Sequence, residues 1–175
     1  MQRGPDPPEP PQPTGGANRQ QQPSARGGQG GQTLKVITES LPVATDGRGQ
    51  MIDLTSEIGR IISKHKMTSG TVTIFVPGST ASITTIEFEP GLKKDFPEAM
   101  ERIAPSGARY HHDDTWHDGN GHSHIRSAVV GPSLTVPFAQ GRLLTGTWQQ
   151  VVLVDWDNRG RRREVIVQLM GVSSG

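Results

Sequence analysis

The sequence predicts an α+β fold with mainly antiparallel β-sheets and two to three helices packed on one side. Two observations support this class. Runs rich in β-branched and aromatic residues outnumber the stretches in which apolar residues recur with helical spacing. Short turn signals join several of these runs, whereas parallel strands need connections of about a dozen residues or more.

The 175-residue chain divides by composition into two regions. Residues 1–32 contain no Leu, Ile, Val, Phe, Trp or Tyr. This Pro/Gly-rich tail cannot bury enough apolar surface to offset the entropy of ordering it, so we expect it to be disordered. Residues 33–172 contain regularly spaced apolar runs and are long enough to form one domain with a single core.

Composition also restricts the partners and the location. A net charge of +1 does not indicate a nucleic acid or an anionic membrane as partner. The chain has no cysteine, which excludes disulfides and thiolate metal ligands. No run approaches the roughly 20 apolar residues of a membrane span, and no signal-peptide core is present, so we expect a cytoplasmic protein.

The first half of the expected domain contains three strands and one helix. Leu34–Leu41 alternates apolar and polar residues, as strands with one buried face do. A helix is expected from Asp53 to about Lys66, because apolar residues recur on one of its faces. Thr71–Pro77 and Ser82–Phe88 are rich in β-branched residues and predict two strands joined by a tight loop.

The second half contains a helical stretch followed by strands. Pro90–Ala104 has a helical stripe, and Pro97 leaves open whether it forms one helix or two short ones. A loop-rich segment is expected next. The remaining strands are predicted at Leu134–Phe138, Leu143–Asp155 and Arg163–Met170, with a hairpin turn at Asp157–Gly160.

Five of the six histidines fall within Tyr110–His124: His111, His112, His117, His122 and His124. The segment also contains Asp113, Asp114, Asp118 and Asn120. Neutral imidazole is the commonest side-chain metal ligand, and carboxylates often support it, so this density predicts a metal site. The alternative is a solvated loop whose histidines cap turns.

The spacing of the histidines suggests how such a site is built. On an extended backbone His122 and His124 point to the same face and can bind one ion. His111 or His112 would supply a third nitrogen, and an open fourth position is typical of catalytic zinc sites. His117 is expected to be exposed or to support the ligands.

Three further segments are candidates for ligand binding. Ser79 and Thr80, between two strands, offer the hydroxyls and free amides that suit a phosphate, although taken alone this segment favours an ordinary tight hairpin. Arg161 and Arg163 share a face on a strand and could hold a phosphate, but a solvated turn is our first interpretation. Trp148 follows Gly146 within a β run, where it could be aimed at a ligand by a bulge or could pack in the core. Aromatic residues do not interleave with the basic run, so nucleic-acid binding is not supported.

Several short motifs occur in the order seen in YjbQ-like proteins, also called the secondary thiamine-phosphate synthase family. The most specific are Asn120-Gly121-His122-Ser123-His124 and Gly146-Thr147-Trp148-Gln149. The others are Phe75-Val76-Pro77 leading into Ser79-Thr80-Ala81, Tyr110-His111-His112-Asp113, Gly131-Pro132-Ser133, Val136-Pro137 and Asp155-Trp156-Asp157 with Arg161 and Arg163. The resemblance covers about residues 33–171. Many members have His after the proline of the first motif, where this chain has Gly78.

The resemblance implies a homotrimer with a weak ability to join an aminopyrimidine diphosphate to a thiazole phosphate, releasing pyrophosphate. Combined with the motifs, it defines three sets of candidate residues. These are catalytic His112, Asp113, Asn120 and Trp148, cofactor- or phosphate-binding Ser79, Thr80, Gln149, Arg161 and Arg163, and metal-binding His112, His122 and His124. Three histidines favour a zinc-like ion over magnesium, which prefers oxygen ligands. A metal-dependent hydrolase of a small phosphorylated metabolite and a non-catalytic metal- or metabolite-binding protein remain as alternatives.

Overall fold

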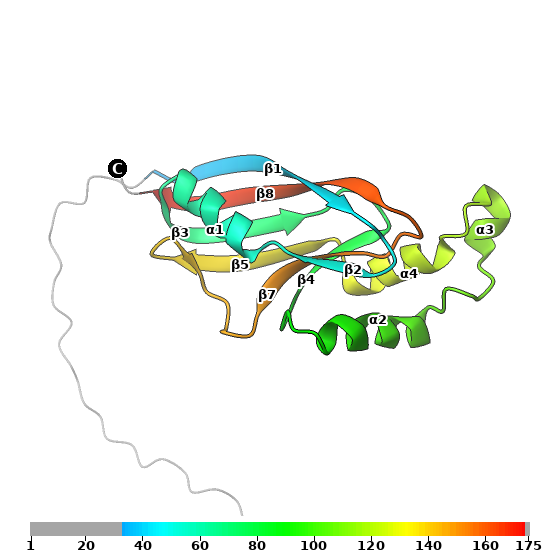
Figure 1. The fold of residues 1–175 in the computed structure, drawn as a ribbon. Coiled ribbons are helices and arrows are strands. Elements are labelled where there is room, and N and C mark those ends of the chain that lie inside the picture. The colour runs from blue at the N-terminus through cyan, green and yellow to red at the C-terminus, as the bar shows by residue number, and fades with distance from the viewer. Residues whose placement is uncertain (1–32, 174–175) are drawn as a thin grey trace, which may run out of the picture. The chain divides into compact units, whose positions relative to one another are not determined.

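The computed structural model describes residues 33–173, so the predicted tail of residues 1–32 lies outside the described part (Figure 1). The described residues form antiparallel sheets with helices, which confirms the predicted fold class. The elements are β1 (Lys35–Thr45), β2 (Gln50–Asp53), α1 (Thr55–Lys64), β3 (Met67–Phe75), β4 (Ala81–Ile86), α2 (Leu92–Ile103), α3 (His111–Trp116), α4 (Gly121–Val130), β5 (Ser133–Ala139), β6 (Arg142–Leu143), β7 (Gln150–Asp155) and β8 (Arg161–Ser173). Within residues 33–173, no helix has the length and apolar character needed to cross a membrane.

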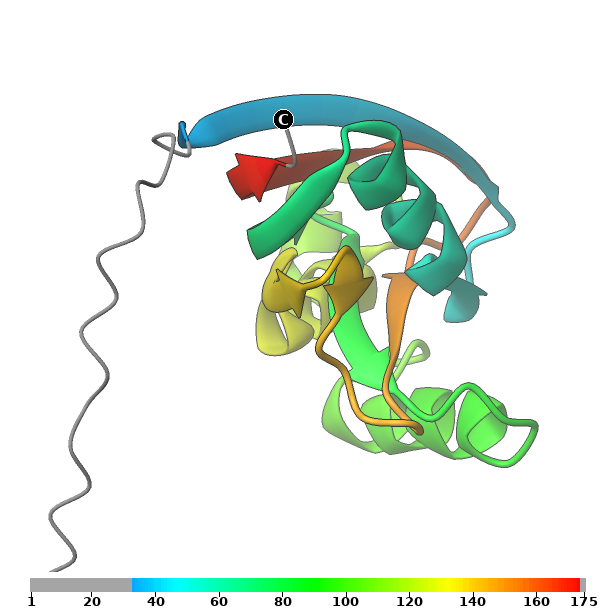
Figure 2. The same cartoon turned by 90° about the vertical axis from the view of Figure 1, so that its left-hand side faces the viewer.

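Two sheets enclose the main core. The larger sheet has the strand order β1-β8-β3-β5-β6, and the smaller has the order β2-β7-β4. Alternation along β8 buries Val165, Val167 and Leu169, as expected for a strand with one covered face. Helix α1 adds Ile58 and Ile62 to this core, in agreement with its predicted apolar face. Figure 2 shows β1 (blue) arching over the top of the view, with α1 below it.

The smaller sheet is covered on both faces. Val151 and Leu153 of β7 pack in the main core, whereas Val152 and Val154 pack in a second cluster with Met100 of α2. The uninterrupted apolar run of β7 reflects this double burial. Because Val130 of α4 packs against the second cluster, and α3 contacts α4, these helices gather on one side of the smaller sheet (Figure 1).

Two predicted hairpins are wrong. β3 belongs to the larger sheet and β4 to the smaller one, so residues 76–80 cross between sheets. β7 and β8 are likewise in different sheets, so residues 156–160 form a second crossing. Turn residues identify where a strand ends, but strand pairing is decided by which face of each strand is buried. These two crossings, which we call the β3–β4 and β7–β8 crossings, frame the candidate site.

The helices also differ from the prediction in places. Pro97 lies inside one continuous helix, α2, whose Phe96 and Met100 pack against the smaller sheet. This packing holds the helix together although Pro97 cannot donate a backbone hydrogen bond. The segment predicted as loop-rich contains α3 and α4. The predicted strand Leu143–Asp155 is divided into β6 and β7.

Candidate functional site

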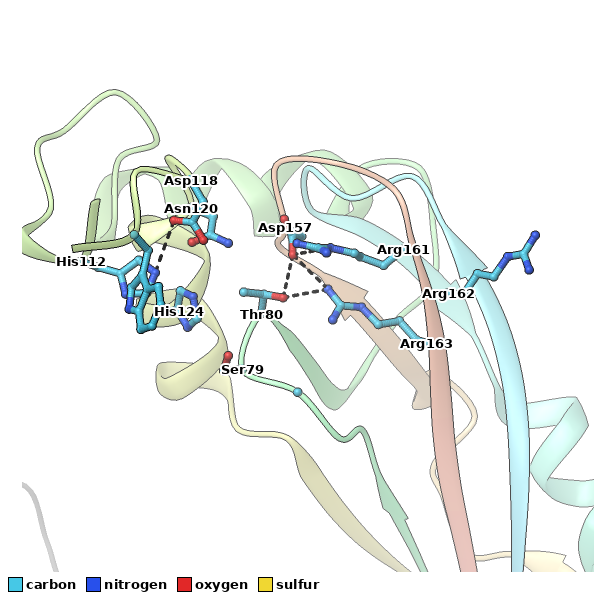
Figure 3. Close-up of a pocket in the computed structure, with 12 residues that line it drawn as sticks. Ser79, Thr80, His112, Asp118, Asn120, His124, Asp157, Arg161, Arg162 and Arg163 are labelled. Carbon is cyan, nitrogen blue, oxygen red and sulfur yellow. Dashed lines mark hydrogen bonds and ion pairs between the residues drawn. The ribbon is translucent and has the colours of Figure 1, made fainter. Parts of the chain in front are cut away.

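A cavity of about 540 Å³ lies where the two crossings meet the first turn of α4 (Figure 3). We call it the main cavity. Its histidines project from α3 and α4, and its arginines project from β8 on the opposite wall. The lining residues are Gly78, Ser79, Thr80, His112, Trp116, Asp118, Asn120, His124, Asp157, Arg161, Arg162 and Arg163. Of the predicted site residues, seven therefore share one cavity although they come from four separate segments of the chain.

The three predicted metal-binding histidines do not converge. His122 and His124 lie on helix α4 and not on an extended backbone, so they are about 200° apart around its axis. His124 faces the main cavity beside His112, with ring centroids 4.2 Å apart. His122 is 7% exposed and lies near the Tyr110 ring, outside this cavity. The extended backbone expected for His122 and His124 is therefore not found, and the two side chains line different cavities.

Three buried polar atoms of main-cavity residues have no hydrogen-bond partner within residues 33–173: His112 Nε2, Asn120 Oδ1 and Asp157 Oδ1. His112 Nε2 lies 3.5 Å from Asp118 Oδ1, which is too long for a good hydrogen bond. Buried polar atoms are nearly always paired, because an unpaired one has lost its water without replacement. Three such atoms facing one hollow indicate a place for a ligand.

The side chains beside His112 include two carboxylates, those of Asp113 and Asp118, but not the imidazole of His122. The ligand atoms of His112, Asp113 and Asp118 lie within 4.8 Å of one another. The backbone N–H of Gly121 donates to Asp113 Oδ1 at 3.1 Å, which fixes this carboxylate against the start of α4. Imidazole nitrogens beside carboxylate oxygens form a donor set that suits zinc-like ions. With the unpartnered His112 Nε2, these residues fit a divalent metal ion.

A network of ion pairs forms the opposite wall. Arg163 donates from Nε and Nη2 to the two oxygens of Asp155, both at 2.7 Å, and from Nη2 to Thr80 Oγ1 at 2.8 Å. Thr80 Oγ1 in turn donates to Asp157 Oδ2 at 2.9 Å, and Arg161 Nε donates to the same oxygen at 2.9 Å. The Thr80 hydroxyl is therefore occupied, and this network joins the two crossings to each other.

Some donor groups of this wall take no part in the ion-pair network. The side chain of Arg161 is 33% exposed and uses only Nε in the network. Gly78 leaves space in front of Arg163, because a Cβ at this position would lie 3.4 Å from Arg163 Nη1. The groups that can meet an anion are thus the terminal nitrogens of Arg161, Nη1 of Arg163 and the hydroxyl of Ser79.

The electrostatics define the charge states in the main cavity. Burial acts to raise the pKa of Asp157, but hydrogen bonds from Arg161 and Thr80 and the charges of Arg161 and Arg163 outweigh it, so the pKa is lowered. Burial lowers the pKa of His124, and neighbouring His112 lowers it further. Near neutral pH, the cavity therefore presents an ionised Asp157 and a neutral His124, the form of imidazole that binds metals.

Trp148 and Gln149 do not line the main cavity. They precede β7, at the end opposite Asp155, and six residues of strand span on the order of 17 Å. Trp148 is 69% exposed and lines a separate hollow of about 240 Å³ with Glu87 and Phe88. Gln149 accepts a hydrogen bond from the backbone N–H of Gly146 at 2.9 Å. Their implied proximity to the histidines is not found within one chain.

Three charged residues that line the main cavity, Asp118, Asp157 and Arg162, are not among the predicted site residues. Asp157 was assigned to a turn, although it follows the apolar run of β7 directly. A carboxylate at the end of a strand buried on both faces must either be paired or be neutralised, and this was the available signal. Asp118 and Arg162 are exposed and carry no comparable signal in the sequence.

The fold and the main cavity define a class of small two-sheet α+β proteins with a site of histidine, carboxylate and arginine side chains. The family model described as UPF0047 protein YjbQ-like matches residues 39–172, and the chain belongs to this family. The family membership inferred from the motifs is thereby confirmed.

The alignments with this chain span nearly the whole length of its relatives. A UPF0047 protein of Mycobacterium tuberculosis is 37% identical over 128 residues, which is 73% of this chain and 93% of that protein. UPF0047 protein YugU of Bacillus subtilis is 33% identical over 137 residues, which is 77% of this chain and 100% of that protein. The crystal structure of a YbjQ-like protein of unknown function from Sulfolobus solfataricus has a TM-score of 0.75 at 29% identity, covering 79% of this chain and 99% of that one.

Proposed function

We propose that the protein is a transferase with weak thiamine-phosphate synthase activity, which joins an aminopyrimidine diphosphate to a thiazole phosphate and releases pyrophosphate. One observation carries this proposal: unpartnered polar atoms of His112, Asn120 and Asp157 face a cavity whose opposite wall presents arginines. A substrate with a polar heterocycle and an anionic group can meet both walls at once. The main cavity, at about 540 Å³, is within the range typical of small-molecule sites.

In this reaction the thiazole nitrogen attacks the methylene carbon of the aminopyrimidine. The bond from that carbon to oxygen breaks, and pyrophosphate leaves with the electron pair of the bond. Arg161 and Ser79 donate hydrogen bonds to the departing pyrophosphate and neutralise its growing charge. A divalent, zinc-like ion held by His112, Asp113 and Asp118, beside the His124 ring, would add positive charge near the diphosphate. Asn120 Oδ1 accepts a hydrogen bond from the aminopyrimidine amine and orients the ring.

Product analysis with purified protein tests the proposal. Thiamine phosphate and pyrophosphate should form in equal amounts and should be lost in His124→Ala. His117→Asn is the matched control, because His117 is exposed, lies outside the main cavity and has a left-handed φ of 54°, which Asn tolerates. If the wild-type protein forms no product and does not support growth of a strain lacking thiamine-phosphate synthase, the transferase is rejected.

A metal-dependent hydrolase of a small phosphorylated metabolite is the second candidate. The cluster of His112, Asp113 and Asp118 favours it, because metal-bound water is a nucleophile in such enzymes. Turnover of a generic phosphoester, abolished by chelation and by His124→Ala, would support the hydrolase over the transferase. Tight metal or metabolite binding without turnover of any tested substrate would instead support a non-catalytic binding protein.

We further propose that the protein is a cytoplasmic homotrimer. Residues 33–173 leave the outer face of the larger sheet uncovered, and it exposes Val36, Phe75 and Met170, at 60%, 39% and 49%. Exposed apolar side chains on one face of a sheet are typical of a subunit interface. Light scattering coupled to size exclusion should give three times the chain mass of 18.9 kDa, and a mass equal to one chain would refute the trimer.

A further inference from the structure

A second cavity, of about 400 Å³, lies beside the first turn of α4 and contains His122, the histidine that turns away from the main cavity. We call it the second cavity. Its lining residues are Arg48, Glu101, Ser106, Gly119, His122, Arg126 and Asn158. Two arginines against one glutamate give this hollow a positive charge at neutral pH, which suits an anionic ligand.

Arg126 brings a buried positive charge to the second cavity. It is 5% exposed, and its Nε and Nη2 donate to the carbonyl oxygen of Ala104 at 3.0 and 2.8 Å. Nη2 also pairs with Glu101, whose carboxylate accepts hydrogen bonds from the backbone and hydroxyl of Ser106 as well. Glu101 is thus shared among several donors, and Arg126 Nη1 has no partner among residues 33–173. A buried arginine whose counter-ion is shared in this way can still bind an anion.

Arg48 is held at the second cavity in a conformation that L residues rarely adopt. Its φ is 57°, between Gly47 at 74° and Gly49 at 79°. The backbone N–H of Arg48 donates to the Asp157 carbonyl at 2.6 Å, so the β1–β2 turn is fixed on the β7–β8 crossing. Asn or Gly would adopt this backbone at lower cost. Strained residues held by their surroundings cluster at ligand sites, and Arg48 has no ion-pair partner among the described residues.

A third hollow, of about 300 Å³, lies at the α3–α4 turn and shares lining residues with both cavities. It is lined by Asp118, Asn120, Asn158, Arg159 and Arg161. Asp118, Asn120 and Arg161 also line the main cavity, and Asn158 also lines the second cavity. Two ligands bound in the main and second cavities would bring their uncharged parts together in the third hollow, near Asn120.

We propose that the second cavity binds the phosphate group of the second substrate, a phosphate monoester, through Arg48 and Arg126. The main cavity then receives the diphosphate of the first substrate, and the two reacting groups meet at the third hollow. The identity of this second substrate as a thiazole phosphate rests on the proposed function. The binding of a phosphate group in the second cavity does not.

Calorimetric titration with inorganic phosphate tests this proposal. The titration is made in an Arg161→Gln background, which weakens binding in the main cavity while keeping a hydrogen-bond donor for Asp157. Adding Arg48→Gly should weaken phosphate binding at least about tenfold, since a hydrogen bond from a charged group is lost. The same change removes backbone strain, so the melting temperature should stay equal or rise. A loss of binding therefore cannot be attributed to unfolding.

Gln140→Gly is the matched control. Gln140 also has a left-handed φ, of 51°, but lies in the β5–β6 turn and lines neither cavity. It should leave phosphate affinity unchanged. The proposal is overturned if Arg48→Gly binds phosphate like its parent, if the control loses binding equally, or if the parent binds no phosphate.

The outcome also separates this proposal from the transferase. Phosphate binding that depends on Arg48, without formation of thiamine phosphate, would retain the second cavity as a phosphate site and reject the transferase. Formation of thiamine phosphate with an unchanged KM for the thiazole phosphate in Arg48→Gly would retain the transferase and reject the phosphate site.

Discussion

Replacing Arg163 by methionine should destabilise the protein much more than the same change at its neighbour Arg162. The side chain of Arg163 is 9% exposed and makes three hydrogen bonds of 2.7–2.8 Å, two to Asp155 and one to Thr80. Methionine has a similar length but cannot pair with Asp155, which is fully buried. Leaving a buried charge without its partner costs about 3–5 kcal/mol.

The structure places the expected cost at the lower end of this range. Asp155 keeps two other donors in the variant, Thr45 Oγ1 at 2.6 Å and the backbone N–H of Asp157 at 3.0 Å. We therefore expect a loss of about 3 kcal/mol in the free energy of unfolding. For a domain of this size, this corresponds to a decrease of about 10 °C in melting temperature.

Urea unfolding followed by circular dichroism measures this difference directly. Arg162→Met is the matched control, since Arg162 is exposed, is the next residue on β8 and makes no ion pair among the described residues. It should change the free energy of unfolding by less than about 0.5 kcal/mol. If Arg163→Met lost no more than the control, the ion pairs could not be what holds the two crossings together.

Three further predictions concern the site and its surroundings. Elemental analysis should find metal bound to His122→Ala as in the wild type and lost from His112→Ala. Loss of metal from both variants would instead favour the ligand set inferred from the sequence. Gly121→Ala should lower the free energy of unfolding by about 1–3 kcal/mol, because a Cβ at this position would overlap the Tyr110 side chain. Gly107→Ala is the control in the same urea assay and should be neutral, because a Cβ there meets nothing within 4 Å. A hydrogen bond from the Ser106 backbone, with further contributions from Arg126, lowers the pKa of Glu101 below 4.5 against the effect of burial. The ionised Glu101 therefore stabilises the fold above pH 4.5, and this stabilisation is lost as the pH falls through the lowered pKa. Acid unfolding of Glu101→Gln should therefore depend less on pH than that of the wild type, and identical pH profiles would contradict this assignment.

The sequence predicts most of the individual elements because each has its own apolar pattern. Ile58 and Ile62 recur at helical spacing and are fully buried in α1, as expected. The apolar pattern of a strand does not show to which sheet the strand belongs. Thr71–Pro77 and Ser82–Phe88 are separated by a short turn-like stretch, which resembles a hairpin. Only the packing of β4 against α4 and β7 shows that the chain changes sheets there.

Helix α4 could not be predicted because tertiary hydrogen bonds, and not an apolar stripe, hold it in place. Its buried face is polar: the Ser123 hydroxyl donates to the Trp156 carbonyl at 2.7 Å, and the Ser127 hydroxyl donates to the Ala81 carbonyl at 2.7 Å. Its apolar residues Ile125 and Val129 are exposed instead. Periodicity reasoning assumes that a helix buries its apolar face, so it fails for such a segment. The expectation that His122 and His124 point to the same face fails because this segment is a helix and not an extended strand.

The partners of Ser123 and Ser127 also explain why the site forms at this place. Trp156 belongs to the β7–β8 crossing, and Ala81 lies at the end of the β3–β4 crossing. Wherever a chain leaves one sheet for another, its backbone carbonyls lose their strand partners and need other donors. Helix α4 supplies these donors from one face, which directs His124 into the main cavity and His122 into the second. The same short helix therefore positions both the hydroxyls that the two crossings need and the histidines that a ligand can contact.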